Sequence, residues 1–462
     1  MTDLAALRSV ARRLLGDEHV LEGTRIGPRY SQDLWGVDRP AEPRLVLRPR
    51  DTAEVAAILR ECQATGTPVA VQGGMTGLVG AGLPGAGEAV LSLERMNRIE
   101  EVDPVARTMT VQAGVTLLAV EERAAASQLE FPLDLASRGS CTIGGCLSTN
   151  AGGNRVLRYG TARALVLGLE VVLADGEVVS GLRKLVKDNA GYDLRDLFVG
   201  SEGTLGVITR AVLRLVPLAT SRQAAFLGLG GVRDALTLLN RLQARLAGAL
   251  TVFEAIWDSA YALVLDTPGL AVLPAGFPVY ALVQSEGSGG AADTERFLSA
   301  LADCGDLIGE GFVATERPDI AKAWAAREAI PMRVLAMKPL IGYDVSLPAA
   351  HLDHFLAEIS DELSATWPKV RLITFGHLGD GNLHLAVVTG GAASPDKAKI
   401  DEVVYRSIGR HFGSISGEHG IGFEKRPYLR YSRSPAEIAL MRRVKTALDP
   451  QGILNPGRVL PP

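Results

Sequence analysis

Two histidine-containing segments hold the side chains best suited to chemistry. The first, GHLGDGNLHL, places His377 and His384 seven positions apart. That spacing would put both imidazoles on one face of a helix, but the Gly-Asp-Gly sequence between them disfavours a helix. We expect two strands joined by an Asp-Gly turn, with both imidazoles near the turn. A histidine pair on its own also arises from packing or hydrogen bonding.

The second segment, GSISGEHGIG, places Glu418 and His419 side by side among glycines that leave room around them. Together with His377 and His384, Glu418 makes a set of two nitrogen ligands and one oxygen ligand. Such a set leaves coordination positions open on a divalent cation, as a catalytic metal requires. Zinc, the metal we expect, fits this set, and so do manganese and iron(II), while His419 remains as a base.

An arginine is the third candidate. Arg327 lies in AWAAREAIP, a segment that we expect to be helical. Taken alone, an arginine on a helix is expected at the surface or in an ion pair, because a charged side chain is seldom buried without a partner.

The segment from Asp134 to Thr161, DLASRGSCTIGGCLSTNAGGNRVLRYGT, is rich in glycine and short polar side chains. Glycines let backbone N–H groups approach a ligand closely, and the short side chains add further donors. We therefore expect a loop that holds a ligand with phosphates and a polar ring. The alternative is a turn-rich surface loop, which is less favoured because loops of this length usually have a function.

A further glycine loop, GGMTG at residues 73–77, directly follows a strand-like run. Shortly after it, Gly80, Gly82 and Gly85 fit the pattern G-x-G-x-x-G. A dinucleotide fingerprint must open a helix, whereas Pro84 and the strand-like AVLSLE accompany this one. The loop at 73–77 is therefore the one expected to hold phosphates.

The elements that position these residues fall into two parts. A strand at residues 42–48, a helix from a capping box of Asp51 and Glu54 to about residue 65, and a second strand begin the first part. Strands then alternate with long helices from about residue 219, which is typical of an antiparallel sheet covered by helices. We expect an α+β fold with a ligand-binding domain at 1–218 (core 43–218), a second domain at 219–425 and a returning segment at 426–462.

Composition excludes several classes of protein. The net charge of −4 argues against a nucleic-acid partner, which would require a basic face. No apolar run is long enough to span a membrane. The four cysteines are too few for a disulfide framework and lack the spacing of a zinc or iron–sulfur set, so we expect reduced thiols and a cytoplasmic location. These are Cys62, Cys141, Cys146 and Cys304.

With these motifs in order, the chain resembles the flavin-dependent family of vanillyl-alcohol oxidase type, and within it the FAD-dependent D-2-hydroxy-acid dehydrogenases. The resemblance runs from about Pro43 to Val459. It depends on QGGMTGLVGAG, SCTIGGCLSTNAGGNRVLRYGT, LEVVLADG, KDNAGYDL, GSEGTLGVIT, GHLGDGNLH, GEHGIG and LNPG. It implies a two-part FAD-binding domain and a substrate domain with an antiparallel sheet covered by helices.

The resemblance also implies which residues hold FAD. The pyrophosphate would lie on residues 73–77, and the rest of the dinucleotide on the long glycine-rich segment and on a later loop. No histidine stands in GGMTG, so FAD held without a covalent bond is expected. The implied cofactor residues are Gly73, Gly74, Met75, Thr76, Gly77, Gly139, Ser140, Thr142, Gly145, Thr149, Asn150, Gly152, Tyr159, Gly160, Glu202, Gly206, Ile208 and Asn455.

For the reaction, His377, His384 and Glu418 match the metal ligands of that family, and His419 matches the base that removes the proton of the substrate hydroxyl. Arg327 matches an arginine that grips a substrate carboxylate, which replaces the surface role expected from its helix alone. The implied reaction is oxidation of a D-2-hydroxy acid to the 2-oxo acid, with hydride transfer to flavin N5.

Three positions depart from the 2-hydroxyglutarate pattern. Relatives of that kind carry threonine, lysine and asparagine where this chain has Pro331, Gly342 and Ala386. A second carboxylate without these partners would be costly to bury. Lys338 or Arg333 could take over their role. A smaller or less polar acid such as D-lactate is therefore a rival to 2-hydroxyglutarate.

Other functions stay open at this point. A metal-dependent hydrolase or lyase would use the His/His/Glu set but would leave the first 215 or so residues unexplained. A flavin subunit of a glycolate or lactate oxidase complex is another alternative, as is an oxidase that reduces oxygen. Electrons are expected to leave to an external acceptor, an electron-transfer flavoprotein or a quinone, because no iron–sulfur cysteines are present. A homodimer is the expected assembly.

Overall fold

A computed structural model describes residues 4–33, 42–390 and 396–461 of the chain. The described residues form two compact units. Unit 1 contains residues 1–153, 160–217 and 418–462, and unit 2 contains residues 154–159 and 218–417. The changeover after Pro217 lies next to the boundary expected at 218, whereas the second changeover lies at Gly417 rather than near 425. Glu418 and His419 are therefore the first residues of the last segment of unit 1.

Unit 1 is built from short strands and mostly short helices. Its helices are α1 (Leu4–Leu15), α2 (Thr52–Thr65), α3 (Leu117–Ala125), α4 (Ile143–Ser148), α6 (Arg195–Phe198) and α13 (Pro435–Leu448). Its strands are β1 (Val20–Leu21), β2 (Val46–Leu47), β3 (Val69–Gln72), β4 (Ala89–Ser92), β5 (Ile99–Asp103), β6 (Thr108–Gln112), β7 (Leu129–Glu130), β8 (Val166–Val172), β9 (Val178–Ser180), β10 (Val207–Arg214) and β11 (Val216–Pro217).

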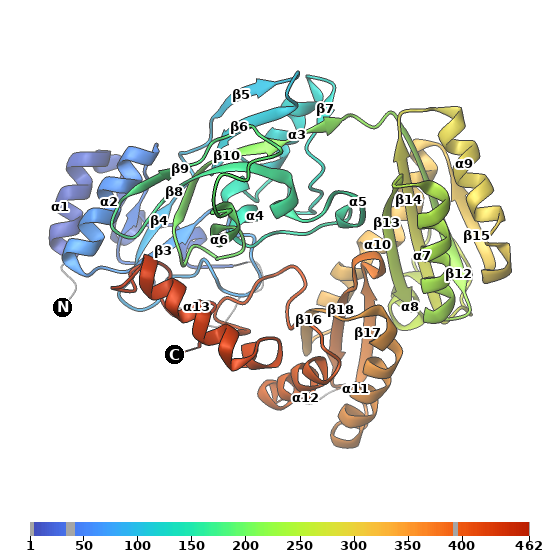
Figure 1. The fold of residues 1–462 in the computed structure, drawn as a ribbon. Helices are drawn as coiled ribbons and strands as arrows, with labels where there is room; N and C mark the ends of the chain where they lie inside the picture. The colour runs from blue at the N-terminus through green and yellow to red at the C-terminus, as the bar shows by residue number, and fades with distance from the viewer. Residues whose placement is uncertain (1–3, 34–41, 391–395, 462) are drawn as a thin grey trace. The chain divides into compact units, whose positions relative to one another are not determined.

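The strands of unit 1 form two main sheets within the described residues. The first has the order β1-β2-β4-β3, with β2 and β3 both parallel to β4. The second has the order β5-β6-β10-β8-β9 and is antiparallel. The C-terminal segment joins the first sheet through a parallel bridge between Val69 and Leu454. Helices α1 and α2 pack together beside this sheet, and their buried residues share its core (Figure 1).

Helix α2 shows how local sequence fixes an element of this unit. The Asp51 side chain accepts a hydrogen bond from the Glu54 N–H at 2.9 Å, which satisfies a free donor at the helix start. Gly66 ends the helix in the left-handed region, at φ +62°. The expected reciprocal bond of a capping box is not made with Asp51, because the Glu54 carboxylate accepts from the Arg50 N–H at 2.8 Å.

Unit 2 has longer elements. Its helices are α5 (Val156–Tyr159), α7 (Val232–Leu246), α8 (Asp258–Leu265), α9 (Ala291–Ala302), α10 (Arg317–Leu335), α11 (Leu352–Thr366) and α12 (Lys397–Arg410). Its strands are β12 (Ser221–Leu229), β13 (Leu250–Trp257), β14 (Val279–Gly287), β15 (Ile308–Ala314), β16 (Leu340–Ser346), β17 (Arg371–Gly376) and β18 (Asn382–Val388).

These strands make one seven-stranded sheet in the described part of the unit, in the order β15-β12-β14-β13-β17-β18-β16. Every assigned pair in it is antiparallel. Helices α8 and α10 cover one face, where their side chains share a core with β12, β13, β14, β17 and β18. Helices α7 and α9 lie side by side along the sheet, and α11 lies beside α12 (Figure 1).

The α+β prediction is confirmed, including an antiparallel sheet covered by helices in the second part. Three differences are local. The strand expected at 42–48 is limited to Val46–Leu47, and the expected loop from Asp134 to Thr161 contains helices α4 and α5. The sequence patterns also did not single out α8, β15 and α12.

Candidate functional site

A cavity of about 360 Å³ opens within unit 1, and the two glycine-rich segments form much of its wall. Strand β3 leads directly into residues 73–77, as expected. A Cβ atom on Gly73 would lie 2.5 Å from the Thr142 hydroxyl, and one on Gly74 would lie 2.0 Å from the Ser140 carbonyl oxygen. Glycine fits these two positions because the 73–77 loop packs closely against the Thr142 side chain and the Ser140 backbone.

Most of the cofactor residues implied by resemblance line this cavity. They are Gly73, Gly74, Met75, Thr76, Gly77, Thr142, Gly145, Thr149, Gly152, Glu202, Gly206, Ile208 and Asn455. Five others do not line it: Gly139, Ser140, Asn150, Tyr159 and Gly160. Tyr159 belongs to unit 2, at the end of α5. The cavity is also lined by residues outside that implied cofactor set, among them Gln72, Leu78, Gly80, Gly82, Ser137, Cys141, Gly144, Cys146 and Ser148.

The long glycine-rich segment is helical where it meets the cavity. The Thr142 hydroxyl accepts a hydrogen bond from the Gly145 N–H at 3.4 Å and so caps α4. This helix also contributes to the core, because its residues Ile143, Cys146 and Leu147 are buried. All four cysteines of the chain are free and buried. A hydrogen bond with the Cys146 thiol lowers the pKa of the Cys141 thiol to about 7.

Glu202 and Asn455 join segments that are distant in the chain at the cavity wall. The Asn455 side chain accepts from the Val71 N–H at 2.7 Å and donates to the Glu202 carbonyl oxygen at 2.5 Å. The two oxygens of the Glu202 carboxylate accept from the N–H groups of Ile421 and Gly422, at 2.7 and 2.8 Å. Burial raises the pKa of the Glu202 carboxyl, although these two N–H donors act in the opposite direction. Glu202 therefore holds the GEHGIG loop through its side chain.

Glu418 and His419, from that same loop, also line the cavity. A Cβ atom on Gly152 would lie 3.0 Å from the Glu418 carboxylate, so glycine at this position leaves room for the acid. The cavity wall of unit 1 thus carries both an acid and an imidazole.

His377 and His384 lie at the turn end of the β17–β18 hairpin, as the sequence predicted. A short 3₁₀ turn, Leu378–Asp380, follows His377, and Gly381 closes it in the left-handed region at φ +78°. His384 pairs with Phe375 across the hairpin, and the two imidazole centroids are 5.5 Å apart. Since side chains alternate along a strand, His384 lies on the same sheet face as Ala386, the face covered by α10. His377, just after β17, contacts the Glu254 carboxylate of β13.

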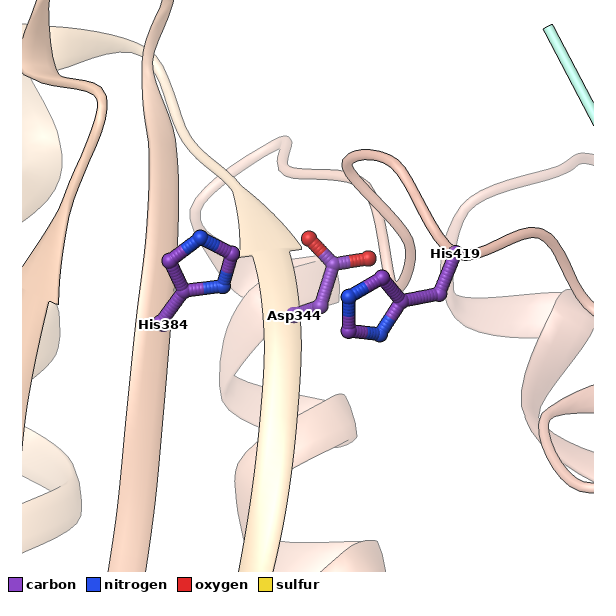
Figure 2. Close-up of side chains that lie close together, drawn as sticks. All are labelled: Asp344, His384 and His419. Carbon is purple, nitrogen blue, oxygen red and sulfur yellow. The ribbon is translucent and has the colours of Figure 1, made fainter. Parts of the chain in front are cut away.

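Two groups of potential metal donors share His384. One is His377, His384 and Glu418, and the other is Asp344, His384 and His419; within each group the donor atoms lie within 4.8 Å of one another. Figure 2 shows Asp344 with the imidazoles of His384 and His419 on either side. Glu418 and His419 directly follow Gly417, the last residue of unit 2.

The first group fits a divalent cation. It offers two imidazole nitrogens and one carboxylate, a donor set suited to zinc, manganese and iron(II). Asp344 of the second group is a residue that the sequence reasoning did not select. Its carboxylate accepts from Asn382 at 2.7 Å and from the Gly417 N–H at 3.1 Å, so it also anchors the start of the loop that carries Glu418. An acid within the apolar run of β16 was the signal that could have indicated it.

Arg327 is buried on α10, with 8% of its surface exposed. Its Nε–H donates to the Glu254 carboxylate at 2.6 Å, and its Cζ lies 4.8 Å from the centroid of the Phe375 ring. The other oxygen of Glu254 contacts Nδ1 of His377. Burial alone would raise the pKa of Glu254, but Arg327 and His377 outweigh it and hold that pKa well below its usual range.

Glu254 is the second residue that the sequence reasoning missed. It is the one charged residue in the strand TVFEAIW, and its side chain is fully buried. A single charge in such a strand indicates a buried partner, but it does not indicate which residue that partner is.

Two of the three departures from the 2-hydroxyglutarate pattern face each other. Gly342 on β16 pairs with Ala386 on β18, and Ala386 is buried in the apolar core beneath α10. Pro331 lies inside α10, one turn after Arg327. Arg333, one of the two suggested substitutes, donates to the Thr267 hydroxyl at 2.5 Å in an exposed contact. Positions 342 and 386 therefore bring no polar side chain to this point of the β16–β18 pair.

Within the described residues, no helix is both long and apolar enough to cross a membrane.

Comparison with known proteins adds a family context to this geometry. Residues 43–181 match the model of a FAD binding domain, and residues 218–459 match the C-terminal domain of FAD linked oxidases. The chain is 40% identical to the mitochondrial D-2-hydroxyglutarate dehydrogenase of Bos taurus, over 99% of this chain and 83% of that protein. It is 36% identical to the D-2-hydroxyglutarate–pyruvate transhydrogenase of Saccharomyces cerevisiae, over 98% of this chain and 93% of the relative.

Among solved structures, p-cresol methylhydroxylase with bound substrate superposes with a TM-score of 0.78 at 16% identity. The match covers all of this chain and 98% of the other. At that identity the likeness concerns the fold alone.

Proposed function

Since the chain belongs to the FAD-linked oxidases that include the D-2-hydroxyglutarate dehydrogenases, we propose that it oxidises a D-2-hydroxy acid to the 2-oxo acid with FAD and a divalent metal. One observation carries the proposal. Glu418 belongs both to the wall of the glycine-rich cavity and to a donor group with His377 and His384. A cofactor cavity and a set of metal donors thus have a residue in common.

The roles of the residues follow from their chemistry. When bound, FAD supplies a hydride acceptor and the metal supplies a Lewis acid toward the substrate hydroxyl. His377, His384 and Glu418 hold the metal. Arg327 holds the substrate carboxylate through its planar guanidinium. His419 accepts the hydroxyl proton as general base.

The metal is proposed to be zinc, with manganese and iron as the alternatives that the donor set accepts. Metal analysis of the purified protein identifies it. FAD is proposed to bind without a covalent link, since Met75 and its neighbours in the 73–77 loop offer no histidine. Release of all flavin on denaturation supports this, and flavin that stays with the denatured chain contradicts it.

For the substrate, we propose a D-2-hydroxy acid with a short or apolar tail, such as D-lactate, over 2-hydroxyglutarate. Gly342 and Ala386 face each other without a polar group, and Ala386 is 3% exposed in an apolar core. An unpaired second carboxylate beside them would lose its hydration without compensation. A steady-state panel of D-2-hydroxy acids tests this, and a clear preference for 2-hydroxyglutarate contradicts it.

The electron acceptor is proposed to be external, an electron-transfer flavoprotein or a quinone. The four cysteines are buried, and they appear in none of the metal-binding groups among the described residues. Reduction of an artificial dye under nitrogen tests the external route. Stoichiometric peroxide formation in air would instead indicate an oxidase.

A homodimer in the cytoplasm remains the predicted assembly and location. Light scattering of the purified protein and fractionation of the producing cells test the two predictions separately.

The decisive experiment follows flavin bleaching by a D-2-hydroxy acid in metal-stripped and metal-restored protein. His377→Ala and Glu418→Ala are expected to abolish turnover and leave the flavin bound. Near-normal turnover in either variant contradicts the metal assignment. A colourless purified protein contradicts the proposed reaction itself.

A further inference from the structure

Glu254 is a fully buried carboxylate in the middle of β13. Its side chain has no exposed surface, and the flanking Phe253 and Ala255 are buried and apolar. Removing a carboxylate from water is costly, and an apolar residue of similar volume would often be at least as stabilising at such a position. The position therefore calls for an explanation beyond stability.

Both oxygens of this carboxylate are used, each by a different element. Oε2 accepts from Nε of Arg327 on α10 at 2.6 Å. Oε1 contacts Nδ1 of His377, just after β17. One carboxylate thus contacts the proposed substrate clamp and a proposed metal ligand.

The contact with Glu254 decides which nitrogen of His377 can bind a metal. A carboxylate accepts hydrogen bonds, so Nδ1 of His377 carries the proton and donates it. Nε2 then carries the lone pair that binding a cation requires. A carboxylate behind a ligating imidazole also fixes the ring orientation and strengthens the ligand.

The same carboxylate orients Arg327. Nε is held by Glu254, and the guanidinium lies over the Phe375 ring with Cζ 4.8 Å from the centroid. Within residues 4–33, 42–390 and 396–461, neither terminal nitrogen of Arg327 has a hydrogen-bond partner. A guanidinium that is held at Nε and stacked on one face is already oriented to bind a planar carboxylate through its two terminal nitrogens.

We propose that Glu254 is a positioning residue that sets the tautomer of His377 for metal binding and orients the Arg327 fork for the substrate carboxylate. The inference rests on the proposed function, because it assigns the partners of His377 and Arg327 from that reaction. The residue that it adds, Glu254, belongs neither to the metal donor groups nor to the cavity wall.

Glu254→Gln separates the two effects. The Arg327 Nε–H can only donate, so the amide oxygen is expected to stay with it. The amide NH₂ then faces Nδ1 of His377, which must accept, and the imidazole proton moves to Nε2. That tautomer has no lone pair for the metal at Nε2, whereas the arginine keeps its anchor.

The test measures zinc affinity in full-length, FAD-loaded protein that has been stripped of metal, by competition with a fluorescent chelator. Glu254→Gln is expected to weaken the zinc affinity about 10- to 100-fold, the range for loss of such a supporting partner. The visible spectrum of the cobalt(II)-loaded protein should change as well. At saturating metal, KM for the hydroxy acid should stay within about threefold of wild type, because Arg327 remains anchored.

Asp401→Asn is a matched control. Asp401 is another buried acid of unit 2, and it accepts from the Tyr343 hydroxyl and from Lys397, both at 2.6 Å. Tyr343 precedes Asp344 on β16, so it points to the opposite face of the sheet. This control should lower thermal stability and leave the zinc affinity unchanged.

If Glu254→Gln does not fold, Glu254→Asp is the variant that tests the proposal. The aspartate side chain is too short for its carboxylate to reach both Arg327 and His377, so this variant should weaken zinc binding at least threefold. If the variant that folds binds zinc as tightly as the wild type, the proposed role of Glu254 is wrong, and the proposed metal function is unaffected. Absence of zinc and cobalt binding in the wild type overturns the proposed metal function together with it.

Discussion

The role of Arg327 can be tested by changing its charge and its shape separately. Arg327→Lys keeps a cation beside the buried Glu254 but loses the planar fork and most of the contact with Phe375. Arg327→Met keeps a long apolar side chain and removes the cation. The two variants therefore distinguish a substrate clamp from a residue that serves only to neutralise Glu254.

The magnitudes follow from these contacts. A charge-assisted hydrogen bond contributes about 1.5–3 kcal/mol, so loss of one bond to the substrate carboxylate raises KM roughly 10- to 150-fold. We expect this in both variants. Arg327→Met also leaves the Glu254 carboxylate with His377 as its remaining partner, and breaking a buried pair in this way costs about 3–5 kcal/mol. Arg327→Lys should lose about 0.5–2 kcal/mol, chiefly from the ring contact.

The assay is dye reduction at saturating metal, with KM and kcat determined for D-lactate and 2-hydroxyglutarate, and unfolding in guanidinium followed by circular dichroism. Arg333→Met serves as the control, since this residue lies on the same helix and donates to Thr267 in an exposed contact. It should change neither KM nor stability appreciably. If Arg327→Lys retains KM within threefold of wild type for both acids, Arg327 does not grip the substrate.

Three further outcomes are expected. Glu202→Gln should weaken FAD retention at least threefold in dialysis, because an amide oxygen replaces two carboxylate oxygens as acceptor for the N–H groups of the loop after His419; unchanged retention would contradict this. The double variant Gly342→Lys/Ala386→Asn should raise kcat/KM for 2-hydroxyglutarate relative to D-lactate at least tenfold, and an unchanged ratio would show that these paired positions do not set specificity. In FAD-free protein, alkylation of Cys141 should rise with pH through about 7 as the thiolate forms, and added FAD should suppress it. Cys62, with its pKa raised to about 12 by burial, should stay unlabelled at pH 8. Mass spectrometry measures the labelling of both cysteines, and equal labelling would contradict the lowered pKa of Cys141.

Local sequence was sufficient for much of this protein. The Asp-Gly pair between His377 and His384 is a turn signal that can be recognised from adjacent residues alone. The hairpin is present, with Gly381 in the left-handed region. The rejection of Gly80, Gly82 and Gly85 as a helix-opening fingerprint also holds, since strand β4 follows them. In both cases the deciding interactions lie within about ten residues, where pattern and backbone preference act directly.

Contacts between distant segments decided the rest. Glu254 is 73 residues from Arg327 and 123 from His377, and nothing near it in the chain indicates either partner. The Glu202 carboxylate bonds to backbone 219 and 220 residues away, so its use in holding a loop is invisible in its own motif. Gly342 and Ala386 are separate departures in the sequence and become one apolar pair only through the register of β16 and β18.

Residue types and their spacing thus determined which chemistry the chain can support: glycine loops for a phosphate-bearing cofactor, and imidazoles with a carboxylate for a cation. Tertiary structure alone decided how those groups are held, because a buried charge takes its partner from whichever strand or helix packs against it. That choice is made by sheet register and helix packing across the whole unit.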